Sequence, residues 1–161
     1  MNDRVSADNI AINVAPATIE ADAPPPGFAP LPLRSGYMGQ FGALYFDAAR
    51  GVIGTRVDER HLNNLDIAHG GMLATLADTA IGAAMMRAAG REPPAVTAHL
   101  GLDYLGVVRP GDWLEAHVEL DKMGARLRFA TCRLMVGSRC MLKANATFAV
   151  LGDPASPSNP G

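Results

Sequence analysis

The chain has 161 residues and a net charge of −2, and its lysines and arginines are dispersed without a block of like charge. This length fits one domain that buries a core, and the charge pattern argues against a general nucleic-acid-binding surface. The first residues contain no continuous apolar segment typical of a secretory signal, so we expect a cytoplasmic protein.

Residues 1–35 are rich in proline and alanine and show little periodicity. Such a composition predicts an extended or disordered arm. The short apolar segments 42–47 and 51–57 are separated by Ala48-Ala49-Arg50-Gly51, which favours a first β-hairpin. A polar loop around Asn63 follows.

Residues 70–89 predict a long helix that is apolar on nearly every side, with the single carboxylate Asp78 inside it. A helix of this kind belongs in the interior of a protein. Its length would allow a membrane span, but Asp78, Thr75 and Thr79 favour a core helix surrounded by strands. A carboxylate in apolar surroundings must replace the hydration that it loses, so its placement there indicates a function.

Four segments rich in Val, Leu, Thr, Phe and Tyr follow a cluster of helix-breaking residues at 90–94. These segments are 95–107, 112–122, 125–136 and 139–151. The order of a hairpin, one long helix and an antiparallel meander predicts an α+β fold in which a single sheet wraps around the helix. We expect the folded domain to span residues 36–151 and a flexible tail to occupy residues 152–161.

The most specific motif joins the polar loop to the helix. Asn63 lies six residues before His69-Gly70-Gly71, and Leu76-Ala77-Asp78 follows within the helix. This spacing resembles the signature of hotdog-fold thioesterases of the phenylacetate-pathway (PaaI-like) type, and the resemblance extends over residues 36–151. The family commonly has glycine three residues before the histidine, where this chain has Asp66.

The resemblance implies a hotdog fold, in which an antiparallel sheet of five to six strands wraps a long central helix. It implies hydrolysis of acyl-coenzyme A thioesters to a carboxylic acid and free coenzyme A, with no metal and no cofactor other than the coenzyme A of the substrate. It also implies self-association as a homodimer or a dimer of dimers with sites at the interface. The dispersed charges and the polar residues of the helix predict no nucleic-acid or membrane partner.

By position, the resemblance makes Asp78 the catalytic carboxylate. The amides of Gly70 and Gly71 would polarise the thioester carbonyl, and Asn63 and Thr97 would position water. The structural alternatives are a local turn for the asparagine and simple β-propensity for the threonine.

The chemistry can also be argued from the residues. A helix N-terminus offers free N–H groups and a positive dipole end, and Gly70 and Gly71 allow close approach of a carbonyl. Asp78 could attack directly or act as a general base for water. It lies about 12 Å along the helix from Gly70, whereas attack requires about 3 to 3.5 Å. If both groups act on one thioester, they must come from two chains, so we expect a dimer.

Five further residues are candidate substrate contacts: His69, Thr75, Gly82, Arg126 and Arg128. The histidine is expected mainly to order the loop by hydrogen bonding. The threonine and the glycine leave room beside the carboxylate for a slender pantetheine arm or for close packing. The two arginines alternate along a predicted strand and either meet coenzyme A phosphates or remain solvated.

Two other functions fit parts of the sequence. A hydratase or dehydratase of acyl thioesters would need an acid–base pair, for which His69 and Asp78 are candidates, but no Asp-x-Asn-Pro-x-x-His sequence is present. A non-catalytic acyl-coenzyme A binding protein would keep the pocket, although the retained carboxylate argues against it. The sequence contains neither a Gly-x-Ser-x-Gly motif nor histidines and cysteines at metal-ligand spacing.

Overall fold

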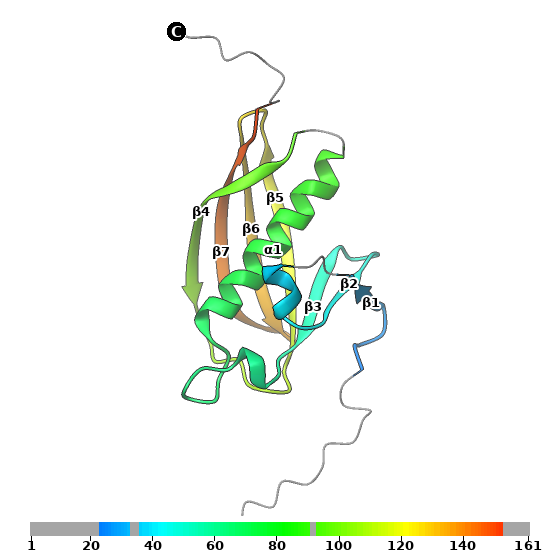
Figure 1. Ribbon diagram of the computed structural model, residues 1–161, viewed down its shortest axis with the longest axis vertical. Coiled ribbons are helices and arrows are strands. Elements are labelled where there is room, and N and C mark those ends of the chain that lie inside the picture. Colours follow the sequence, from blue (N-terminus) through cyan, green and yellow to red (C-terminus); the bar gives the residue numbers. More distant parts are fainter. Residues whose placement is uncertain (1–22, 33–35, 91–92, 153–161) are drawn as a thin grey trace, which may run out of the picture.

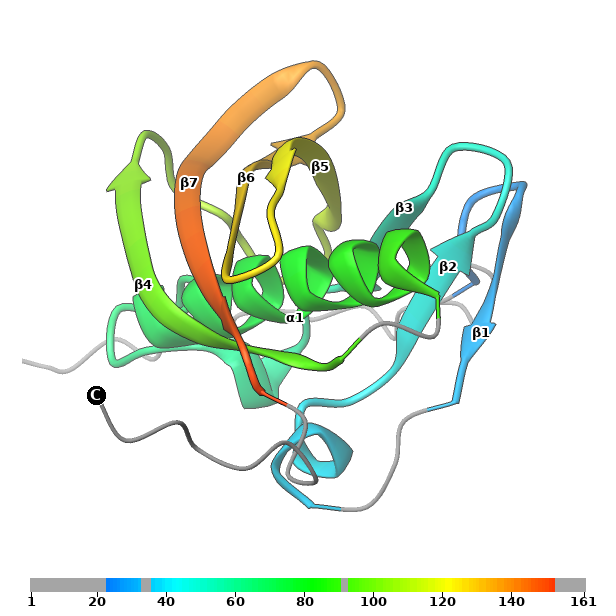
Figure 2. The ribbon, with the colours of Figure 1, turned by 90° about the horizontal axis from the view of Figure 1, so that it is seen from above.

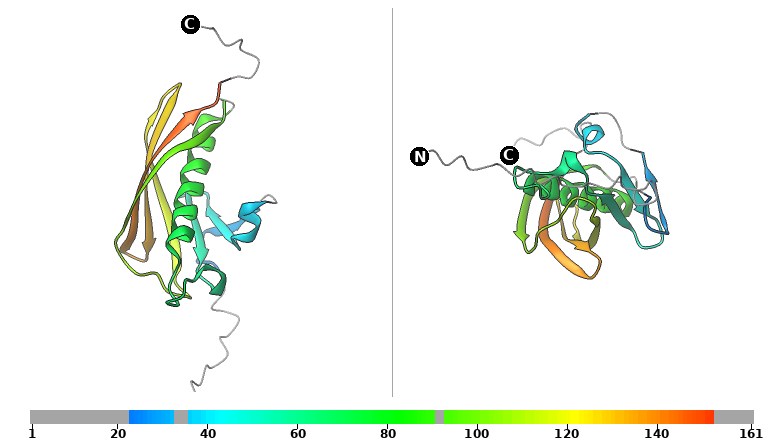
Figure 3. Two further views of the ribbon diagram at one scale, coloured as in Figure 1. Left: turned by 60° about the vertical axis from the view of Figure 1, so that its left-hand side comes forward. Right: turned by 90° about the horizontal axis from the view of Figure 1, so that it is seen from below.

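The computed structural model describes residues 23–32, 36–90 and 93–152 (Figure 1). In chain order the elements are β1 (Phe28–Leu31), the 3-10 turn η2 (Tyr37–Gln40), β2 (Leu44–Asp47), β3 (Val52–Arg56), the 3-10 turn η3 (Glu59–His61), α1 (Gly70–Ala89), β4 (Ala95–Tyr104), β5 (Trp113–Met123), β6 (Leu127–Val136) and β7 (Arg139–Val150). The strands form one sheet in the order β1-β2-β3-β5-β6-β7-β4, and every pair is antiparallel. The sheet curls around α1 (Figures 2 and 3). The predicted α+β architecture is confirmed, with seven strands rather than five or six.

The additional strand, β1, lies within the segment that we expected to be an extended or disordered arm. Residues 28–31 pair in antiparallel register with β2, and the Phe28 ring packs edge-on against Trp113 with the ring centroids 5.0 Å apart. An edge strand tolerates proline because one of its sides needs no ladder hydrogen bonds, and Pro30 takes such a position opposite Tyr45. The ordered sheet therefore begins earlier than residue 36.

Helix α1 has the predicted bounds, but in the single chain only the side that faces the sheet is buried. Its buried residues recur at helical spacing and face the sheet: Met72, Leu73, Leu76, Ala77, Ala80, Ile81, Ala84 and Met85. The opposite face is partly or fully exposed, and Met86 on it is 70% exposed. One sheet can cover only one side of a helix, so this face remains open. Within the described residues, no helix combines the length and the apolarity needed to cross a membrane.

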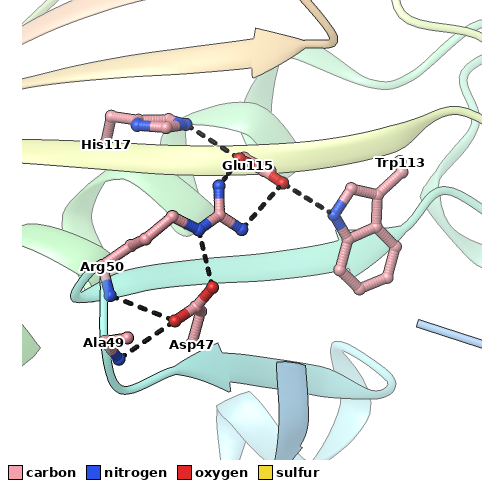
Figure 4. Close-up of polar contacts among 6 residues, drawn as sticks. All are labelled: Asp47, Ala49, Arg50, Trp113, Glu115 and His117. Carbon is pink, nitrogen blue, oxygen red and sulfur yellow. Dashed lines mark hydrogen bonds and ion pairs between the residues drawn. The ribbon is translucent and has the colours of Figure 1, made fainter. Parts of the chain in front are cut away.

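The turn between β2 and β3 is held by Asp47, which is 5% exposed. Its carboxylate accepts two turn N–H groups at 3.0 Å and the Nε of Arg50 at 2.6 Å (Figure 4). Arg50 also donates to Glu115 on β5 at 3.1 Å, and Trp113 donates to the same carboxylate. Hydrogen bonds from the Arg50 side chain and backbone keep the pKa of Asp47 below its usual range. This network fixes the hairpin to β5.

We expect Arg50→Met to lower the free energy of unfolding at pH 7 and to lower it less at pH 2. A carboxylate whose pKa is depressed in the folded state stabilises the protein above its ordinary pKa of about 3.9, and this contribution disappears as the pH falls through the folded-state pKa. Urea denaturation at both pH values measures the difference. Arg133→Met, at an exposed position of β6, is the control and should show no such pH dependence. Equal losses for Arg50→Met at both pH values would contradict the prediction.

Candidate active site

Asp78 lies on the open face of α1 and contacts strand β4. The Thr97 hydroxyl donates to its Oδ1 at 2.7 Å, which joins two residues that the sequence analysis selected independently of any contact. Asp78 is only partly buried in the single chain, which corrects the expectation of a fully buried carboxylate. Its Oδ2 has no hydrogen-bond partner among the described residues. One oxygen of the carboxylate is therefore fixed, and the other accepts no hydrogen bond from the described residues.

The position of Thr97 depends on an irregularity in β4. Its register with β7 shifts between Thr97 and His99, so Ala98 is an extra residue in the strand. β-Bulges of this kind redirect neighbouring side chains and are frequent beside active sites. The sequence contains no signal for this bulge.

A cavity of about 570 Å³ extends from Asp78 along the C-terminal half of α1. Most of its lining is apolar and includes Gly82, Met85, Met86 and Phe148. A Cβ atom at the glycine would lie 3.6 Å from the phenylalanine ring, so this glycine leaves space between the helix and the sheet. The cavity can accommodate an apolar group next to the carboxylate.

Arg126 and Arg128 lie in different environments. Strand β6 begins at Leu127, so Arg126 lies in the preceding turn, where it is exposed and its carbonyl accepts the N–H of Val150. Arg128 points toward the helix side of the sheet, is 2% exposed and lines the Asp78 cavity. The two arginines therefore do not form one solvent-facing site in this chain.

His69 caps the N-terminus of α1. Its Nδ1 accepts the N–H of Gly71 at 2.9 Å, so His69 orders the helix start by hydrogen bonding. The N–H of Gly70 has no hydrogen-bond partner among the described residues. Of the two amides that were predicted to polarise a carbonyl, only that of Gly70 is available in this arrangement.

Hydroxyl groups hold the carbonyls of the same two glycines. Tyr104, at the end of β4, donates to the carbonyl of Gly70 at 2.9 Å, and Thr75 donates to that of Gly71 at 2.9 Å. Because the Thr75 proton is used in this way, the Tyr37 hydroxyl, 3.2 Å from Thr75 Oγ1, is the donor of that pair. The sequence analysis missed Tyr104, which lies 34 residues beyond Gly70 and shares no local motif with it.

Asn63 is directed into its own loop rather than toward Asp78. Its Oδ1 accepts the N–H of Leu65 at 2.8 Å, and its backbone N–H donates to Ile67 at 2.8 Å. This is the local Asx turn that was the structural alternative to a role in positioning water. Within the turn, Asp66 has a φ of 55° and is the one described non-glycine residue with a left-handed backbone.

The left-handed conformation explains why glycine suits position 66. We expect Asp66→Gly to raise the free energy of unfolding by about 0.5 to 1 kcal/mol, because glycine relieves a left-handed penalty of about 1 to 2 kcal/mol but loses more chain entropy on folding. Denaturation midpoints measure the change. Asn64→Gly is the matched control, because the backbone of the exposed Asn64 is not left-handed, and it should be neutral or destabilising. A loss of stability in Asp66→Gly would show that the aspartate side chain itself holds the loop.

The two ends of α1 face different cavities. His69 and Gly71 line a second cavity of about 400 Å³ with Tyr37 and Arg60, whereas Asp78 lines the cavity at the other end. A single chain therefore separates the helix-start amides from the carboxylate. Neither these cavities nor the remainder of the described chain gathers three His, Cys, Asp or Glu side chains that could hold a metal ion.

Known proteins share both the sequence and the fold. The model of the thioesterase superfamily matches residues 65–139. A Pseudomonas aeruginosa protein named "Putative esterase PA0474" is 46% identical over 129 residues, which cover 77% of this chain and 95% of that protein. Mouse acyl-coenzyme A thioesterase 13 is 32% identical over 79 residues, which cover 49% of this chain and 56% of that protein.

Two solved structures extend the comparison. A Bacillus halodurans protein solved with coenzyme A has a TM-score of 0.62 and 25% identity, covering 67% of this chain and 71% of that one. The Escherichia coli PaaI protein of the phenylacetic acid degradation operon has a TM-score of 0.58 and 24% identity, covering 63% and 72%. The predicted hotdog fold is confirmed, and the chain belongs to the thioesterase superfamily.

Proposed function

We propose that this protein hydrolyses acyl-coenzyme A thioesters to a carboxylic acid and free coenzyme A. The observation that carries the proposal is the Asp78–Thr97 pair, which lies at one end of an apolar cavity in a member of the thioesterase superfamily. The name of the mouse relative and the coenzyme A bound to the Bacillus halodurans protein support the same class of substrate.

In the proposed reaction, Thr97 holds one oxygen of Asp78 while the other oxygen acts on the thioester. Oδ2 either attacks the carbonyl carbon, so that the C–S bond breaks and water later hydrolyses the anhydride, or takes a proton from an attacking water molecule. The free N–H of Gly70, at the positive end of α1, stabilises the negative charge that develops on the carbonyl oxygen. Coenzyme A leaves as the thiolate.

We further propose that each site is shared by two chains. Asp78 follows Gly70 by eight residues, about 12 Å along the helix, and the two residues face different surroundings in one chain. The open face of α1 adjoins β4, whose outer edge is unpaired and which carries the exposed Val96 and Tyr104. Unpaired edges and exposed apolar groups of this kind favour association. A homodimer or a dimer of dimers would therefore bring the amide of one chain to the carboxylate of the other.

The acyl group is proposed to occupy the apolar cavity along the C-terminal half of α1. Met85 and Met86 supply flexible side chains that adapt to different acyl shapes. Arg128 is buried at this cavity and does not face solvent, whereas Arg126 is exposed. Arg126 is therefore the better candidate for contact with the phosphates of coenzyme A.

The proposal is tested by the release of free thiol from short, medium, long and aryl acyl-coenzyme A thioesters by the purified wild-type protein. We expect turnover of at least one member, and the preferred member identifies the acyl class. Hydration of an enoyl-coenzyme A is measured in parallel. Hydration without thiol release would favour the hydratase alternative, and the absence of turnover on the whole panel would contradict the proposal.

A further inference from the structure

The peptide between Gly70 and Gly71 is held at both ends by side chains. Its carbonyl accepts the Tyr104 hydroxyl at 2.9 Å, and its N–H donates to His69 Nδ1 at 2.9 Å. The preceding peptide is also fixed, because the His69 carbonyl accepts the N–H groups of Met72 and Leu73 at 3.0 and 3.2 Å. Gly70 connects these two peptides, and its own N–H has no hydrogen-bond partner in the described part of the chain.

Because residue 70 is glycine, the backbone at the helix start depends on neighbouring side chains to hold it in one conformation. A Cβ atom at Gly70 would lie 3.4 Å from the Tyr104 ring, an ordinary contact distance, so the tyrosine lies directly against the helix start. Glycine is also the most permissive residue in its backbone angles. The direction of the Gly70 N–H group is therefore set by the contacts of the peptides around it. Hydrogen-bond donors that stabilise charge in a transition state are effective only when they are already held in the right direction.

Tyr104 is itself held on a rigid element. It ends β4 in register with Leu142 of β7, and the N–H groups of the next two residues donate to the Met141 carbonyl at 2.9 and 3.1 Å. The side chain is not part of the core, because Tyr104 is 52% exposed. Its hydroxyl thus has a defined partner but no evident role in packing.

We infer that Tyr104 is a positioning residue for thioester hydrolysis. Its hydroxyl fixes the first peptide of α1, and with His69 it holds the Gly70 N–H in the direction from which it meets the thioester carbonyl. The inference rests on the proposed function, since it assigns Tyr104 to the same reaction. It also predicts that the Tyr104 hydroxyl orders the start of α1, and this effect can be measured without turnover.

The test is Tyr104→Phe, which removes the hydroxyl and keeps the ring. We expect kcat to fall about three- to tenfold, the size of effect typical of one net hydrogen bond, with KM unchanged and the thermal midpoint lowered by no more than a few degrees. Tyr45→Phe is the matched control, because Tyr45 lies on β2 against Trp113 with the ring centroids 5.5 Å apart, away from the helix start. It should leave kcat unchanged.

Hydrogen exchange of the amides of residues 71–73 provides the second readout. We expect these amides to exchange about three- to tenfold faster in Tyr104→Phe and at the wild-type rate in Tyr45→Phe. Unchanged exchange in Tyr104→Phe, an unchanged kcat, or a loss of kcat accompanied by faster exchange throughout the chain would overturn the inference. If the wild type releases no thiol, the proposed function fails and the catalytic role of Tyr104 fails with it. The exchange rates then still decide whether its hydroxyl orders the helix start.

Discussion

Asp78→Asn is expected to lower kcat by about 10³-fold or more and to change KM little. Asparagine keeps the size of the side chain and an oxygen that can accept the Thr97 hydroxyl, but it is neither a nucleophile nor a base at neutral pH. Removal of a general base typically lowers the rate by about 10² to 10⁴-fold, and loss of a nucleophile lowers it at least as much. The rate of thiol release at saturating substrate measures the effect, and calorimetry with coenzyme A checks that binding is retained.

The matched control is Asp103→Asn, which changes an exposed aspartate that lies opposite Lys143 on the outer face of β4. It should retain the activity of the wild type. Circular dichroism and the thermal midpoint of both variants show whether the fold is intact. An Asp78→Asn protein that is folded and keeps more than about a tenth of the wild-type kcat would exclude the carboxylate as nucleophile or base.

Two inactive variants are expected to restore activity when they form a heterodimer. A chain with Asp78→Asn still supplies the Gly70 amide, and a chain with Gly70→Pro, which removes that N–H at the first helical position, still supplies the carboxylate. If each site takes one group from each chain, one of the two sites in such a pair is intact, so about half of the wild-type activity should return. Co-expression with two different affinity tags isolates the heterodimer, and thiol release measures its activity.

The reciprocal pair is the control for this experiment. When Asp78→Asn and Gly70→Pro are placed in the same chain and paired with a wild-type chain, both shared sites lose one group, and no activity should remain. Sites contained within one chain would give the opposite result, with half of the activity in this pair and none in the first. Elution as a monomer at micromolar concentration would argue against the shared site before either assay.

Local sequence patterns were sufficient to predict the positions of most helices and strands. The helix begins and ends where predicted, at Gly70 and Ala89, because a capping motif and a glycine bound a continuous apolar segment. The four strands that follow agree with the predicted segments to within a few residues, since turns rich in glycine and proline separate them. The motif spacing was also sufficient to select Asp78, and the family resemblance selected Thr97; the structure joins these two residues by a hydrogen bond.

Contacts between distant segments were decided only by the tertiary structure. The proline-rich composition placed residues 28–31 in the predicted arm, because proline is rare in strands. These residues form β1 because they pair with β2, a contact that the local sequence does not reveal. The hydrogen bond from Tyr104 to the Gly70 carbonyl likewise appears only when β4 lies beside α1, whereas the His69 cap on the Gly71 amide is a local contact. The sequence by itself determined the elements and singled out Asp78 as the candidate carboxylate, because these follow from short-range periodicity and spacing. The tertiary structure decided which side chain holds the Gly70 carbonyl and which face of the helix is open, because both depend on the packing of segments that are far apart in the chain.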